Sequence, residues 1–109
     1  MTEPEIDVSV LATRLAGGEP TMLLDVRETW EHEIAALPGS LLVSLGELPG
    51  RLDEVRPPEG TLLVIYCHHG MRSLQATLLV RATGVSQAVS LAGGIDAWSR
   101  AVDPRVPRY

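Results

Sequence analysis

The segment TLLVIYCHHGMRS, residues 61–73, indicates the fold of this chain. Its first six residues form a short apolar run without polar alternation, which is typical of a strand buried on both faces of a parallel sheet. Cys67 follows, then a turn containing Gly70, then a helical pattern. Ligands of such sheets bind at the carboxyl ends of the strands, so the sequence places Cys67 where chemistry is expected.

Strands and helices are predicted to alternate on both sides of this segment, with Thr29 and Ser73 as helix N-caps. Leu45–Val55 is interrupted by proline and glycine, so we expect only helical turns there. Alternation of this kind predicts an α/β fold of three layers, a central mainly parallel sheet flanked by helices. The expected strands are Met22–Val26, Ser40–Val43, Thr61–Tyr66 and Gln87–Leu91, and the expected helices are Val8–Ala16, Thr29–Ala36, Ser73–Thr83 and Ile95–Arg100.

Size and composition indicate one globular domain over residues 1–109. The net charge of −5 and the scattered arginines argue against nucleic acid as a partner. Apolar runs are far shorter than a membrane span requires, and the N-terminus lacks the basic start of a signal peptide. We therefore expect a cytoplasmic protein without a membrane partner. The single cysteine is compatible with a reducing compartment.

Cys67 and Arg72 are the candidate catalytic residues. A turn that contains Gly70 lets backbone N–H groups converge, and Arg72 and the start of a helix add positive potential. Such surroundings favour the ionised form of a thiol, and the thiolate is the nucleophile. An arbitrary lone cysteine is more often a buried packing residue, but the residues after Cys67 favour reactivity.

The other loop residues have supporting parts in this prediction. His68 and His69 are expected to tune the local field, because adjacent histidines beside Cys67 do not provide the spaced set that a closed metal site needs. Met71 is expected to form an apolar wall of the loop mouth. No metal site is predicted. The active-site loop thus comprises His68, His69, Gly70, Met71 and Ser73.

Residues outside the loop are given structural parts. Asp25 and Arg27 are expected to form an ion pair at a strand end. We expect His32 to be an ordinary surface residue. Gly93 and Gly94 are predicted to form a tight turn against the active loop. Trp30 and Trp98 are assigned to core or rim packing, and Glu28 to local scaffold.

Four motifs occur in order along nearly the whole chain, and together they resemble the rhodanese family, specifically its small single-domain members. Four residues separate Cys67 from Arg72, whereas cysteine phosphatases and arsenate-handling loops place five there, which gives a wider cradle for a tetrahedral oxyanion. The shorter loop favours a smaller guest, such as a sulfur atom carried on the cysteine. The motifs are Asp25–Glu28, Pro38–Ser40, Tyr66–Ser73 and Leu91–Trp98.

The resemblance implies a thiosulfate sulfurtransferase-like enzyme that needs no metal and no organic cofactor. It also implies that Asp25 and Arg27 support the active loop and contact substrate. Cys67 would take a sulfane sulfur from a small-molecule donor such as thiosulfate, hold it as a persulfide, and pass it to a thiol or to cyanide. A sulfur-accepting protein is a further candidate partner. Loop N–H groups would stabilise thiolate and persulfide, while Arg72 would attract the anionic donor and stabilise departing sulfite. The alternatives are a non-catalytic rhodanese-like binding module and a cysteine-dependent phosphatase or arsenate reductase.

Overall fold

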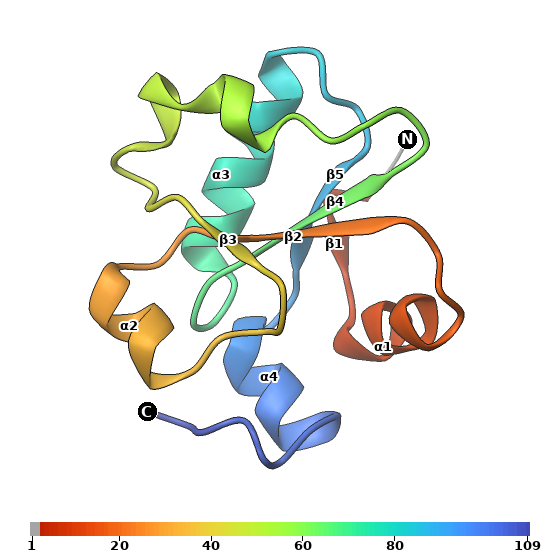
Figure 1. Cartoon of the computed structure of the whole chain (residues 1–109), viewed down its shortest axis with the longest axis vertical. Helices are drawn as coiled ribbons and strands as arrows, with labels where there is room; N and C mark the ends of the chain where they lie inside the picture. The colour runs from red at the N-terminus through yellow and green to blue at the C-terminus, as the bar shows by residue number, and fades with distance from the viewer. Residues whose placement is uncertain (1–2) are drawn as a thin grey trace.

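A five-stranded parallel sheet forms the centre of the protein (Figure 1). The computed structural model describes residues 3–109. All four strand pairings are parallel, and the strand order is β1-β5-β4-β2-β3. The predicted α/β fold with helices on a parallel sheet is therefore confirmed. The strands are β1 (Glu5–Ile6), β2 (Thr21–Asp25), β3 (Leu41–Leu42), β4 (Leu62–Tyr66) and β5 (Ala88–Leu91).

Helices cover both faces of the sheet and complete three layers (Figure 1). One face packs against α3 and the two 3₁₀ turns, and the other packs against α1 and α4. Successive residues of a strand point to opposite faces. Accordingly Leu63 and Ile65 enter the first core, while Val64 and Tyr66 enter the second. The helices are α1 (Val8–Ala16), α2 (Thr29–Ile34), η1 (Leu48–Gly50), η2 (Leu52–Val55), α3 (Met71–Ala82) and α4 (Gly94–Ala101).

Helix N-termini are where the sequence-based boundaries were wrong. The N-cap of α3 is Gly70, with φ of 107°, and the helix begins at Met71, so Ser73 lies inside the first turn. The N-cap of α2 is Glu28 rather than Thr29, because Glu28 and Glu31 form a reciprocal capping box. Strand β1 was not predicted, since two residues paired at a sheet edge carry no periodic signal.

Strand register brings the two functional segments together. Asp25 of β2 pairs with Tyr66 of β4, so the chains leaving these strands start side by side. The next bond continues the ladder, from the Val26 N–H to the Tyr66 carbonyl at 3.1 Å. Cys67 therefore emerges next to the segment that carries Arg27. Within residues 3–109, no helix has both the length and the apolar character needed to cross a bilayer.

Candidate active site

The sulfur of Cys67 accepts hydrogen bonds at the N-terminus of α3. The N–H groups of Gly70 and Ser73 donate to Sγ at 3.1 and 3.3 Å. These are the N-cap and third positions of the helix, whose N–H groups have no partner inside the helix. Cys67 is 1% exposed, so the sulfur is almost completely sheltered. Two aimed N–H donors and the positive end of a 12-residue helix therefore face the sulfur.

Helix α4 fixes the outer side of the same loop. Its first N–H groups, from Ile95 and Asp96, donate to the carbonyls of Cys67 and His68 at 2.9 and 3.1 Å. Gly94 makes this approach possible, because a Cβ there would lie 2.5 Å from the Cys67 carbonyl oxygen and the residue has φ of +63°. The predicted packing of the glycine turn against the active loop is confirmed.

We expect Gly94→Ala to destabilise the protein by about 2 kcal/mol, through left-handed strain and overlap with the loop carbonyls. Urea unfolding measures the loss, and iodoacetamide labelling should show altered access to Cys67. Gly46→Ala is the matched control, since Gly46 has no atom within 4 Å of a built Cβ. Equal stability and equal labelling in the two variants would show that the α4 contact does not hold the loop.

Arg72 is paired with Glu31 of α2 rather than turned freely to solvent. Its two terminal nitrogens donate to both carboxylate oxygens, at 2.7 and 2.9 Å. Glu31 is 3% exposed. The hydrogen bond from Arg72, opposed by burial, lowers the pKa of Glu31 to about 2. The same bond raises the pKa of Arg72, and negative charge on Cys67 adds to the effect. Arg72 therefore acts on the sulfur through its field while its charge is compensated.

Glu31→Gln should lower the free energy of unfolding at neutral pH by about 3 kcal/mol. This is the stabilisation expected from a carboxyl group whose pKa falls from its usual 4.5 to about 2 on folding. That contribution is present above pH 4.5 and is lost as pH falls toward 2. Urea unfolding at pH 7 and pH 3 tests this pH dependence. The difference in free energy of unfolding between wild type and variant should be smaller at pH 3 than at pH 7.

Glu47→Gln is the control for this experiment, since Glu47 forms an exposed pair with Arg51. Its effect should stay within about 0.5 kcal/mol. If the difference in free energy of unfolding between wild type and Glu31→Gln is the same at pH 7 and pH 3, the pH dependence does not come from Glu31.

Asp25 and Arg27 form a completely buried pair below the loop. Asp25 accepts from the Arg27 backbone N–H, from Nε and from Nη2, at 2.9, 2.9 and 2.7 Å. His32, expected to be an ordinary surface residue, instead places Nδ1 at 2.8 Å from the Asp25 carboxylate. Neither member of the pair reaches the surface, so both contact the rest of the site through their partners. Their expected contact with substrate stays a prediction.

Tyr109 links that buried pair to the ion pair of the loop. Its hydroxyl accepts from Arg27 Nη1 and donates to Glu31 Oε2, both at 2.8 Å. The ring stacks on His68, with centroids 3.9 Å apart and 7° between planes. Trp30, 59% exposed, meets the same ring edge-on. Burial raises the pKa of Tyr109 to about 12, with Arg27 opposing and Glu31 reinforcing the shift, so the hydroxyl keeps its proton.

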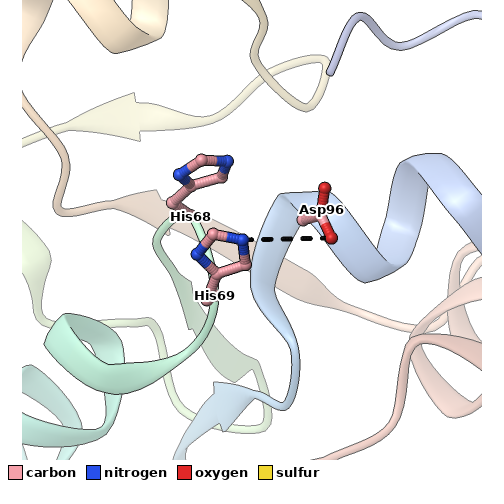
Figure 2. Close-up of side chains that lie close together, drawn as sticks. All are labelled: His68, His69 and Asp96. Atoms are coloured by element: carbon pink, nitrogen blue, oxygen red, sulfur yellow. Dashed lines mark ion pairs between the residues drawn. The ribbon is translucent and has the colours of Figure 1, made fainter. Parts of the chain in front are cut away.

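His68, His69 and Asp96 cluster at the loop mouth (Figure 2). Their donor atoms lie within 4.8 Å of one another, a spacing that would fit a metal ion. However, the two rings stack on each other, with centroids 3.9 Å apart and 28° between planes. Arg108 and Arg100 also donate to the Asp96 oxygens, each at 3.0 Å. We therefore interpret the cluster as charge pairing of the loop with the chain after α4.

The two histidines differ in their surroundings. His68 has a lowered pKa because of burial and, to a smaller degree, because of His69. Its Nε2 is buried and has no hydrogen-bond partner among residues 3–109. His69 is exposed, and its Nε2 lies 4.0 Å from Asp96. Met71 is 81% exposed, so His69 and Met71 form the solvent-facing rim of the loop.

Three contributors to the site were missed in the sequence. Glu31 had a local signal, since it lies three residues after Glu28 in a capping-box spacing. Tyr109 is 78 residues away from Glu31 in the chain, and no local pattern predicts that contact. Ser90 lies in a strand that was expected only to build the sheet, yet its hydroxyl contacts Ser73 at 2.7 Å.

The fold and the loop together define a three-layer α/β domain with a cysteine at the N-terminus of a helix. The family model described as the rhodanese-like domain matches residues 7–101, and the chain belongs to that family. The sequence is 36% identical over 96 residues to a protein named sulfurtransferase from Allochromatium vinosum, with 88% of each protein covered. The resemblance inferred from the motifs is thus confirmed.

Two further relatives show how the domain occurs elsewhere. Over 97 residues the chain is 37% identical to adenylyltransferase and sulfurtransferase MOCS3-1 of Zea mays, covering 84% of this chain. It spans only about a fifth of that relative's length, 21%. The solved human single-domain sulfurtransferase TSTD1 is 30% identical, with a TM-score of 0.81, and the match covers 92% of this chain and 98% of the human one.

Proposed function

We propose that this domain is a sulfurtransferase that carries sulfane sulfur on Cys67. The observation that supports it best is the sulfur atom placed as acceptor for two N–H groups at the start of α3. A fixed set of donors that faces an atom bearing negative charge lowers the cost of forming that charge. The names of the relatives are in keeping with this chemistry.

The proposed reaction has two displacements. The Cys67 thiolate attacks the outer sulfur of a donor such as thiosulfate, an S–S bond forms, and the bond to the sulfonate breaks so that sulfite leaves with its electron pair. An acceptor thiolate or cyanide then attacks the outer sulfur of the persulfide, and the Cys67 thiolate departs. Neither step changes the overall electron count, and neither requires a resident metal or organic cofactor.

The chain offers one thiol for this cycle, so the acceptor comes from outside it. A small thiol, cyanide or a sulfur-accepting protein fits this role. Cys67 is almost fully buried, while Met71 beside it is 81% exposed, so we propose that the acceptor approaches over the rim formed by His69 and Met71. The same shelter keeps bulk water from a bound persulfide.

Incubation with thiosulfate should add one sulfur atom to the protein, and cyanide should remove it as thiocyanate. Intact mass spectrometry measures both steps, and Cys67→Ser should show neither. Where no persulfide donor loads wild-type Cys67, the proposal fails and the non-catalytic binding module takes its place.

The role proposed for Arg72 is to attract an anionic donor and stabilise departing sulfite. A single Arg72→Ala variant would leave buried Glu31 unpaired and would damage the fold as well. The sharper comparison is therefore Glu31→Gln against Glu31→Gln/Arg72→Ala. We expect kcat/KM for thiosulfate to fall by about 10-fold or more on loss of the guanidinium. Equal kcat/KM values for thiosulfate in Glu31→Gln and in Glu31→Gln/Arg72→Ala would show that Arg72 has no part in the reaction.

A further inference from the structure

Ser90 carries a buried hydroxyl that the reaction above does not use. It lies on β5, and its Oγ is 2.7 Å from Oγ of Ser73 on α3. Both serines are 0% exposed. Ser73 Oγ in turn lies 3.4 Å from the sulfur of Cys67. Three polar atoms from β5, α3 and the end of β4 thus form one short chain inside the core.

The number of hydrogens on these three groups decides which atom donates in each hydrogen bond of the series Ser90–Ser73–Cys67. Each hydroxyl has one hydrogen, and a buried O–H without an acceptor costs free energy. Among the described residues, Ser73 Oγ is the single hydrogen-bond partner of Ser90 Oγ. A neutral Cys67 thiol donates to Ser73 Oγ at 3.4 Å. An ionised sulfur has no hydrogen and can only accept, so in that state Ser90 donates to Ser73 and the Ser73 hydrogen points at the sulfur. In the ionised state this O–H is a third donor to Cys67, beside the two backbone N–H groups.

The ionised and neutral forms of Cys67 fit this chain differently. With a thiolate, two hydrogens serve two contacts, from Ser90 to Ser73 and from Ser73 to sulfur, and every polar atom is satisfied. A neutral thiol brings a third hydrogen to the same two contacts, so one hydrogen has no acceptor. The number of hydrogens in the two serine hydroxyls thus matches a sulfur that only accepts.

We propose that Ser90 is a positioning residue, which orients the Ser73 hydroxyl so that it donates to the Cys67 thiolate. The value of this arrangement to sulfur transfer rests on the proposed function, but the hydrogen-bond chain itself does not. Arg72 of α3 is the charged group that interacts with the sulfur, and its charge is paired with Glu31 of α2. The serine pair adds an uncharged hydrogen bond to the same sulfur, and the residue that orients it, Ser90, lies on β5.

The test is the pH dependence of Cys67 alkylation by iodoacetamide, because only the thiolate reacts. We expect Ser90→Ala and Ser73→Ala each to move the midpoint upward by about half a pH unit or more, since each removes a hydrogen bond to the charged form. The double variant should match Ser73→Ala, because Ser90 acts through Ser73. Cooperative urea unfolding verifies that each variant is folded.

Thr77→Val is the matched control. It also removes a buried hydroxyl from α3, but that hydroxyl donates to the Ser73 carbonyl at 2.8 Å rather than toward the sulfur. Its alkylation midpoint should equal that of wild type. An unchanged midpoint in Ser90→Ala, a shift of equal size in Thr77→Val, or additive shifts in the double variant would each overturn the proposal.

Sulfur loading of the same variants separates this inference from the proposed function. If wild-type Cys67 loads sulfur from no persulfide donor, the proposed sulfurtransferase function is wrong. The alkylation midpoints would still decide whether Ser90 orients Ser73.

Discussion

The site depends on one constraint: the N-terminus of α3 has a sulfur atom where other helices have a capping oxygen. Gly70 has no side chain to accept a hydrogen bond, so the Cys67 sulfur takes the N–H groups of Gly70 and Ser73. The helix thereby gains its cap, and the sulfur gains donors that are already aimed. Because one contact serves both fold and chemistry, the loop cannot relax without changing the sulfur's surroundings.

Two further layers keep this contact in place. On one side, the start of α4 binds the loop carbonyls, with Gly94 allowing the close approach. On the other, a chain of hydrogen bonds runs from buried Asp25 through Arg27, Tyr109 and Glu31 to Arg72. Each buried charge in this chain has an opposite charge or a hydroxyl against it, which lowers the cost of burial. Arg72 is thus positioned by segments far apart in sequence.

The sequence was sufficient for the parts that rest on local patterns. The apolar run before Cys67 predicted β4, alternation of strands and helices predicted the parallel sheet, and the glycine pair predicted the turn beside the loop. The start of α3 was misplaced because Ser73 has the composition of an N-cap, while the sulfur takes that role from outside the helix. Tyr109 and Ser90 could not be found, because their contacts arise only when distant elements pack.

The position of the donors also bears on the direction of the proposed transfer. Thiolate charge lies on Sγ, where the N–H groups of Gly70 and Ser73 point. In a persulfide the charge moves to the outer sulfur, about 2 Å farther along the S–S bond, and the same donors face a nearly neutral atom. Donors fixed at Sγ therefore stabilise free Cys67 more than loaded Cys67. A better stabilised thiolate is a better leaving group, so in the proposed reaction these donors would favour delivery of sulfur to an acceptor over its retention.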